Sequence, residues 1–198
     1  PGLSLRPLTA ADFACTGPQM SAILEGSLVD QQQQFVDEMS APGAASKLSD
    51  AVQTLDPTQL EAYTTIADWA QQRYDWEQAP DSVSAPRLEF LLLGTAGTGK
   101  THTAKAGITK VRHVFRDFNA VLTLAFSGVA AANLGSGSRT IDGIFHTNTE
   151  DAAKDLVGDA LDLLVSTLRS VRLLVGDEIS TVGATQFTII AKRLHQVR

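Results

Sequence analysis

The amino-acid sequence predicts an α/β domain of three layers, in which helices cover both faces of a parallel sheet. From residue 88 onward, short apolar runs alternate with segments whose apolar residues follow a helical period. This alternation is typical of parallel sheets whose strands are connected by helices. A glycine-rich segment at residues 94–101 joins the first apolar run to the first of these helices.

The region before the sheet is predicted to have two parts. Residues 1–50 show no clean period, and we expect a loosely structured segment in which a helix from Met20 to Met39 is possible. Residues 51–87 are predicted to contain a helix, because Asp56 can cap it and Pro57 suits its first position. The end of this part holds two prolines and is predicted to be a linker.

The third part, residues 88–198, is predicted to contain the strands and helices of the sheet. The first apolar run is nearly continuous, as expected of a strand that is buried on both faces. Strands are predicted at residues 88–93, 120–126 and 171–175, and helices at residues 100–115, 127–134, 157–168 and 187–194.

Composition and charge exclude several classes of protein. Of the 198 residues, 43% are hydrophobic and 19% are charged, which excludes disorder of the whole chain. The single cysteine excludes an internal disulfide and a cysteine-based zinc site, and the four histidines have no ligand spacing. No apolar run approaches the roughly 20 residues of a membrane-spanning helix. We therefore expect a soluble intracellular protein.

The net charge of −6 is unevenly distributed along the chain. Residues 1–87 hold four basic and twelve acidic side chains, whereas residues 88–198 hold twelve basic and ten acidic ones. A polyanion responds to the local field of a protein rather than to its total charge. A nucleic-acid partner for residues 88–198 is therefore not excluded.

Residues 94–101 read Gly-Thr-Ala-Gly-Thr-Gly-Lys-Thr and match the phosphate-binding loop, or P-loop. Glycines let backbone N–H groups point at phosphates, and the following helix N-terminus adds a favourable dipole. Lys100 would bind the β- and γ-phosphates, and Thr101 would bind Mg²⁺. A glycine-rich turn with a chance lysine is the alternative. The predicted ATP-binding loop residues are Gly94, Thr95, Ala96, Gly97, Thr98, Gly99, Lys100 and Thr101.

Two carboxylates follow the third predicted strand. Asp177 and Glu178 would lie at the carboxyl end of a parallel strand, where α/β sheets bind their ligands. Asp177 is predicted to hold the Mg²⁺ ion, and Glu178 to orient or deprotonate the attacking water. The alternative is an ordinary helix cap or solvated loop.

The combination of motifs resembles the petite-integration-frequency (Pif-one) family of DNA helicases. The resemblance covers about residues 52–198. It includes the P-loop, Ser-Gly-Val-Ala-Ala-Ala-Asn-Leu at residues 127–134 and Asp-Glu-Ile-Ser at residues 177–180. The resemblance implies a RecA-like P-loop ATPase that moves 5′ to 3′ on DNA, with roles in DNA repair, recombination and telomere maintenance. It also implies ATP, Mg²⁺, single-stranded DNA and duplex junctions as partners, and the nucleus or mitochondrion as location.

Further site residues follow from the same resemblance. Small residues let backbone amides approach a phosphodiester, as sequence-independent strand binding requires. Tight packing between a helix and a strand is the alternative, and for the aromatic residue of this set the alternative is the core. The residues implied to contact single-stranded DNA are Ser127, Gly128, Val129, Thr140 and Phe145.

Gln59 matches the glutamine with which the family recognises the adenine edge. Asp56 and Gln59 also have the spacing of a capping box, in which the Gln59 side chain would bond the start of its own helix. Both readings stay open from the sequence.

The sequence departs from the family in two places. Asp142 replaces the histidine of a Thr-Ile-His motif, and an acid beside a DNA phosphate is unfavourable. The sequence ends shortly after the third strand, so the second motor domain and its arginine finger are expected to be absent, leaving a nearly inactive fragment. The rival readings are an oligomeric AAA+-type ATPase and a non-catalytic, nucleotide- or DNA-binding remnant of a truncated gene.

Overall fold

The protein is described by a computed structural model that covers residues 17–40, 44–80, 84–135, 137–149 and 151–197. Its centre is a three-stranded parallel sheet in the order β2-β1-β3. The strands are β1 (Val121–Ala125), β2 (Arg139–Thr140) and β3 (Leu173–Asp177). The predicted α/β class with a parallel sheet is therefore confirmed.

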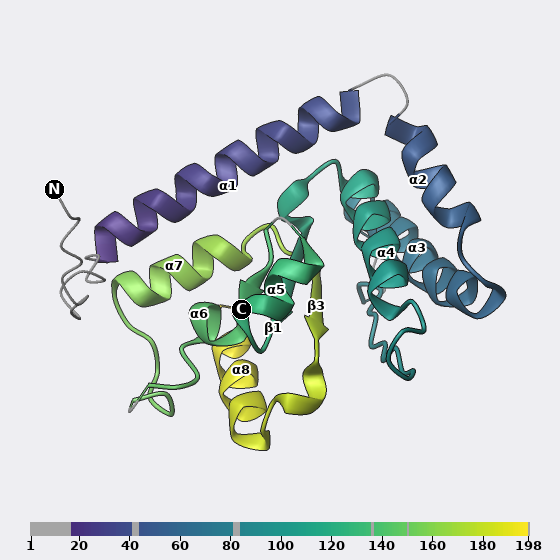
Figure 1. Ribbon diagram of the computed structural model, residues 1–198. Coiled ribbons are helices and arrows are strands. Elements are labelled where there is room, and N and C mark those ends of the chain that lie inside the picture. The colour runs from purple at the N-terminus through teal and green to yellow at the C-terminus, as the bar shows by residue number, and fades with distance from the viewer. Residues whose placement is uncertain (1–16, 41–43, 81–83, 136, 150, 198) are drawn as a thin grey trace, which may run out of the picture.

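The side chains of β1 alternate between two hydrophobic clusters, as the period of a strand requires. Val121 packs with Trp69 and Ile108 on one face, and Leu122 and Leu124 pack on the other. The first face is covered by α3 (Pro57–Gln78) and α4 (Lys100–Phe115). The second is covered by α6 (Ile141–Phe145), α7 (Asp159–Leu168) and α8 (Ala184–Gln196). These are the three predicted layers (Figure 1).

The start of α3 is fixed by a capping box. The Asp56 carboxylate accepts hydrogen bonds from the N–H groups of Thr58 and Gln59 at 2.8 and 2.9 Å. The Gln59 side chain accepts the N–H of Asp56 in return, at 3.1 Å. Because these bonds satisfy donors that a helix start leaves free, the predicted helix begins at Pro57.

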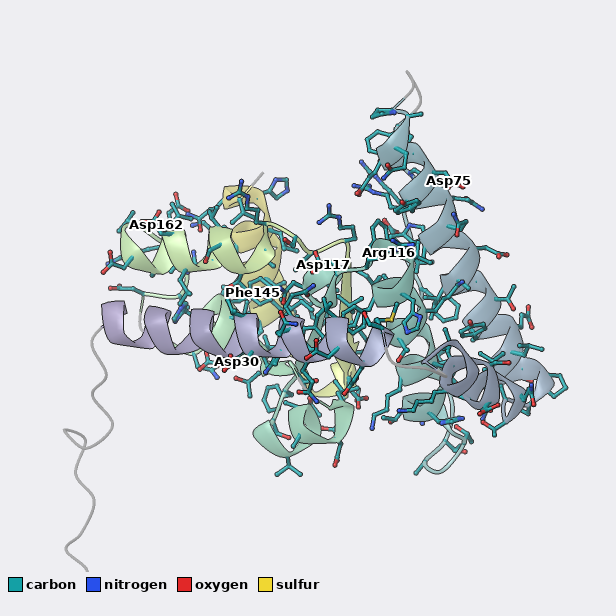
Figure 2. All side chains as sticks on the ribbon, turned by 90° about the horizontal axis from the view of Figure 1, so that it is seen from above. Asp30, Asp75, Arg116, Asp117, Phe145 and Asp162 are labelled. Carbon is teal, nitrogen blue, oxygen red and sulfur yellow. The ribbon has the colours of Figure 1, made fainter. Side chains whose placement is uncertain are left out.

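Two helices precede α3 (Figures 1 and 2). The first, α1 (Gly17–Ser40), spans the range in which the sequence allowed a helix, and it contacts α7. The second, α2 (Ala44–Gln53), was not predicted, and it contacts α4. Gln32 accepts the N–H of Phe118 at 2.8 Å, and Phe35 packs on the Phe118 ring. These contacts attach α1 to the segment that enters β1.

The other predicted elements lie where expected, with one exception. The helix at 127–134 is α5 (Gly128–Leu134), and β1, α7, β3 and α8 overlap their predicted ranges. The predicted strand at residues 88–93 is wrong. The structure contains no strand at these residues, and no backbone hydrogen bond joins them to any other part of the described chain. A strand forms only beside a partner strand, and this segment lines a cavity together with β3 instead of pairing with it. Leu91 and Leu93 are consequently 64% and 79% exposed.

No helix in the described ranges is both long enough and apolar enough to cross a membrane.

A buried arginine organises the far end of α8. Arg193 is 1% exposed. Its guanidinium donates to the carbonyl oxygens of Phe145, Lys154 and Ala152, at 3.3, 2.6 and 2.9 Å. It also donates to Gln196 at 3.0 Å. Arg193 therefore holds the loop between α6 and α7 against α8.

Replacing Arg193 by alanine is expected to lower the free energy of unfolding by about 1–3 kcal/mol, because buried carbonyl groups lose their donor. Thermal unfolding followed by circular dichroism measures the effect. The exposed Arg169 provides the matched control, since Arg169→Ala removes the same charge without breaking a hydrogen bond within the described chain. Equal melting temperatures for the two variants would contradict the structural role of Arg193.

Candidate functional site

The P-loop forms a turn that leads directly into α4. Gly99 caps the helix in the left-handed region, with φ of 76°, and Gly97 has φ of 80°. Side chains with a Cβ rarely adopt this conformation. A Cβ on Gly99 would also lie 2.3 Å from Nε2 of Gln59. The sequence pattern therefore matches a backbone shape that needs glycine at both positions.

The Lys100 ammonium group is held inside the curl of this loop. Its Nζ donates to the carbonyl oxygens of Gly94 at 2.8 Å and Thr95 at 2.6 Å. The Thr98 hydroxyl donates to the same Thr95 carbonyl at 2.9 Å. The Lys100 ammonium group thus has only neutral carbonyl acceptors within its own loop. A phosphate oxygen would form a stronger, charge-assisted hydrogen bond with it.

Gln59 joins α3 to the P-loop. Its Nε2 donates to the Thr98 carbonyl at 3.1 Å, while its Oε1 accepts the Asp56 N–H at 3.1 Å. The capping-box contact is therefore present. The side chain also lies against the P-loop, 39 positions further along the chain. Adenine recognition by Gln59 remains a prediction.

Asp177 and Glu178 lie at the carboxyl end of β3, as predicted. The Asp177 carboxylate accepts the Glu178 N–H at 2.9 Å. Glu178 itself is exposed and has a positive φ of 53°, a conformation that is uncommon outside glycine. Glu178 occupies the N-cap position of the 3-10 turn that follows, but its side chain makes no cap bond there. The solvated-loop alternative stays open, since Glu178 is exposed.

One cavity of about 450 Å³ brings the P-loop and the acidic pair together. We call it the P-loop cavity, and its polar lining includes Lys100, Thr101, Asp177 and Glu178. A hydroxyl and a carboxylate are the hard oxygen ligands that Mg²⁺ prefers, with phosphate oxygens and water completing the shell. The residues present therefore fit Mg²⁺ together with a nucleotide. Elsewhere, the described residues contain no cluster of three histidine, cysteine or acidic side chains.

The sequence missed one contribution to this cavity. Ile66 lines it from α3, and it packs so closely on α4 that a Cβ on Gly107 would lie 2.9 Å from its Cδ1. The helical stripe of α3 indicated only that Ile66 is apolar. Nothing in the stripe indicated that Ile66 borders the P-loop cavity.

The predicted strand-contacting residues occupy the starts of two short helices. Ser127 caps α5 by accepting the Ala130 N–H at 3.2 Å, and Thr140 caps α6 by accepting the Gly143 N–H at 3.1 Å. Gly128 is exposed, and Val129 is 76% exposed. The first three of these lie just beyond the carboxyl end of β1, and Thr140 is the last residue of β2, so all four lie on the sheet edge that also carries Asp177.

Phe145 requires a correction. Its ring is 0% exposed and belongs to the core cluster with Leu122 and Leu164 (Figure 2). A ring with no exposed face cannot stack on a base, so the core alternative agrees with the structure. The Asp142 carboxylate, in turn, bonds the Asn148 N–H at 2.7 Å within its own loop.

A comparison with protein-family models found an AAA domain at residues 71–198. The match includes the P-loop, the acidic pair and the whole sheet, whereas Gln59 precedes it. Searches of curated proteins and of solved structures found no match. AAA domains are P-loop domains of nucleotide-binding ATPases. The matched region is more than half of the chain, and the chain therefore belongs to the AAA domain family.

Proposed function

We propose that this chain is the nucleotide-binding part of the first motor domain of an ATP-dependent DNA helicase of the Pif-one type, which moves 5′ to 3′. The observation that carries the proposal is the shared P-loop cavity, whose lining includes Lys100 of the P-loop together with Asp177 and Glu178. Roles in repair, recombination or telomere maintenance, in the nucleus or mitochondrion, follow from the family resemblance.

Four polar residues of the cavity have roles in the proposed hydrolysis. Lys100 exchanges the Gly94 and Thr95 carbonyls for the β- and γ-phosphates, where it neutralises charge that builds up during transfer. Thr101 and Asp177 hold the Mg²⁺ ion, which supplies charge neutralisation when it is bound. Glu178 orients the attacking water and accepts its proton, and its exposed carboxylate is open to solvent for this purpose.

Single-stranded DNA is proposed to contact the α5 and α6 starts. Ser127, Gly128, Val129 and Thr140 present small or exposed groups on the sheet edge that holds the P-loop cavity. Small groups let the backbone approach a phosphodiester without reading its sequence. Phe145 is omitted from this set because of its burial. A strand bound here would lie on the sheet edge that also carries Asp177, so we expect its presence to alter the rate of hydrolysis.

The test of this function is ATP hydrolysis with and without an oligothymidylate strand. DNA-dependent stimulation supports the proposal. The interface is probed with Val129→Glu, which places an acid where a phosphate is expected, and Val165→Glu on α7 is the matched control, since Val165 is also exposed. Stimulation that is equally strong in wild type and Val129→Glu would remove the α5 start from the interface.

The second candidate is an oligomeric AAA+-type ATPase, which the family match favours. Such ATPases work as rings, in which neighbouring subunits complete each site. Light scattering during turnover separates the candidates. A ring that forms with ATP, and an ATPase rate that rises with protein concentration but not with DNA, would select this second function.

Base recognition by Gln59 gives a further prediction. If its amide pairs with adenine, Gln59→Ala loses a preference for ATP over GTP of about 1–3 kcal/mol. Asp56→Ala is the matched control, because it breaks the same capping box and leaves the amide intact. We expect both variants to melt at a lower temperature and only Gln59→Ala to lose its preference. A Gln59→Ala variant that keeps its preference would leave Gln59 with the capping role alone.

A further inference from the structure

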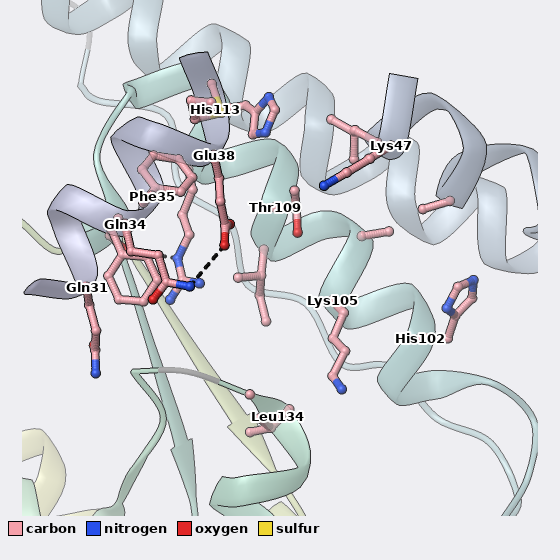
Figure 3. Close-up of a pocket in the computed structure, with 18 residues that line it drawn as sticks. Gln31, Gln34, Phe35, Glu38, Lys47, His102, Lys105, Thr109, His113 and Leu134 are labelled. Carbon is pink, nitrogen blue, oxygen red and sulfur yellow. Dashed lines mark hydrogen bonds between the residues drawn. The ribbon is translucent and has the colours of Figure 1, made fainter. Parts of the chain in front are cut away.

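A second cavity borders α4 next to the P-loop cavity. It has a volume of about 490 Å³ and is bounded by α1, α2, α4 and the end of α5 (Figure 3). We call it the basic pocket. Ile108 and Leu134 line both cavities, so they form part of the wall between them. The basic pocket contains no residue of the P-loop itself before α4.

The charges around the basic pocket oppose the charge of the chain. The protein carries −6 overall, yet Lys47, Lys105 and Arg112 line this pocket, and Glu38 is the only acidic residue among the described residues of its lining. Lys47 and Lys105 are exposed, and neither has an ion-pair partner among the described residues. Figure 3 shows that Lys47 comes from α2, Lys105 from α4 and Glu38 from α1. Two lysines from different helices thus line one cavity.

The remaining charged and titratable groups of the pocket already have partners. Arg112 donates to the carbonyl oxygens of Phe118 and Val121 and lies over the Phe118 ring, 3.8 Å from its centre. His102 bonds the Thr54 hydroxyl at 2.9 Å, and Glu38 accepts a hydrogen bond from Gln34 at 3.1 Å. His113 packs edge-on against the Phe35 ring, with 6.2 Å between the ring centres, and burial, with a smaller contribution from Lys110, lowers its pKa. The two lysines are therefore the groups that a ligand would neutralise.

The rest of the lining suits a flat ring with polar edges. Phe35 and Met39 provide apolar surface on α1, and Gln31 and Gln34 bring side-chain amides from the same helix. Amides can both donate to and accept from the edge of a base. The volume lies within the roughly 300–1,000 Å³ of small-molecule sites. The two lysines would suit the phosphate of a nucleotide unit, and the apolar surface with its amide groups would suit the base.

We propose that the basic pocket binds a nucleotide unit, with its phosphate between Lys47 and Lys105 and its base against the α1 face. This site is separate from the ATPase site and does not rest on the proposed function. The unit is either a free nucleotide or one nucleotide of a single strand. Both share the same chemistry, and the experiment below distinguishes them.

The experiment measures equilibrium binding to the full chain by calorimetry. Every variant also carries Lys100→Ala, which lowers the nucleotide affinity of the P-loop cavity. The two probes are adenosine monophosphate and a ten-residue oligothymidylate. Lys47→Ala with Lys105→Ala is expected to weaken the binding of the preferred probe about tenfold or more, because two charge-assisted contacts are lost. Lys110→Ala removes one lysine charge from the same helix outside the pocket, and it is expected to change affinity less than twofold, or about 0.4 kcal/mol.

Glu38→Gln supplies an opposite test of the same site. Removing the single acid of the lining should strengthen phosphate binding by about threefold to tenfold, since a nearby like charge is lost. A variant that merely damaged the fold could not produce tighter binding. Both lysines are exposed, and unchanged melting temperatures are expected for all of these variants.

The two probes identify the source of the nucleotide. Equal affinity for both probes indicates a free nucleotide. Tighter binding of the oligothymidylate, with a steep dependence on salt, indicates a single strand. The proposal is overturned if neither probe binds at millimolar concentration, or if the double lysine variant binds as tightly as its Lys100→Ala parent. Because that parent already lacks the P-loop lysine, failure here leaves the proposed ATPase site untouched.

Discussion

Replacing Lys100 by alanine is expected to weaken ATP binding about tenfold or more, because a charge-assisted hydrogen bond to phosphate contributes about 1.5–3 kcal/mol. Turnover is expected to fall by a further factor of about 10²–10³, since the ammonium group also stabilises charge that develops in the transition state. Calorimetry measures the binding and phosphate release measures the turnover. In the free protein Nζ bonds only carbonyl groups of its own loop, so no other side chain takes over its role.

Lys110→Ala is the matched control, because it removes the same charge from the same helix and Lys110 does not line the P-loop cavity. The control should keep wild-type affinity and turnover. Losing the two Lys100 contacts should not unfold the protein, since the loop carbonyls of Gly94 and Thr95 lie in an exposed segment. Unchanged ATP affinity in a folded Lys100→Ala variant would contradict the assignment of this loop as the phosphate site.

The parts of the fold that could be predicted are those in which local sequence agrees with tertiary packing. The apolar run of β1 is buried on both faces, and the helix after the P-loop begins at Lys100. Asp56 and Gln59 specify a helix start through bonds within four residues of each other. Such local signals need no knowledge of the rest of the chain.

The predictions that were wrong depend on contacts with distant parts of the chain, which a local sequence pattern does not reveal. Residues 88–93 have the composition of a strand, but pairing depends on a neighbouring edge, and this segment lines a cavity together with β3 instead. Phe145 follows a motif that the resemblance places beside DNA, yet its ring fills the space between Leu122 and Leu164. Burial is decided by elements that arrive later in the chain, which is why the ring could not be placed from its neighbours alone.

The candidate site shows the same division. The P-loop and the acidic pair were identified from spacing, because their chemistry requires particular residue types in a fixed order. The basic pocket could not be predicted from spacing, because Lys47 and Lys105 come from different helices and share no motif. Only the docking of α1 and α2 on α4 brings these side chains around one space. Charge clusters that are built between elements therefore depend on tertiary structure.

Replacing Glu178 by glutamine is expected to lower the rate of ATP hydrolysis by about 10²–10⁴, the contribution of a positioned general base. The amide keeps the size of the side chain but cannot accept the proton of the attacking water. ATP affinity should change little, because Lys100, Thr101 and Asp177 remain in place around the phosphates. Single-turnover hydrolysis with protein in excess over ATP separates the chemical step from binding and product release. This format also suits a slow enzyme, which is expected because the described lining of the P-loop cavity contains no arginine.

Glu89→Gln is the matched control for this experiment. Glu89 is also exposed and lies in the segment that borders the P-loop cavity, yet it does not line the cavity. The same neutralisation there should leave the rate unchanged, which excludes a general effect of charge. If Glu178→Gln hydrolyses ATP as fast as the control, the positive φ of Glu178 has no catalytic purpose and the water must be activated elsewhere. Asp177→Asn would then be the next variant to measure, because Asp177 is the other carboxylate of the P-loop cavity.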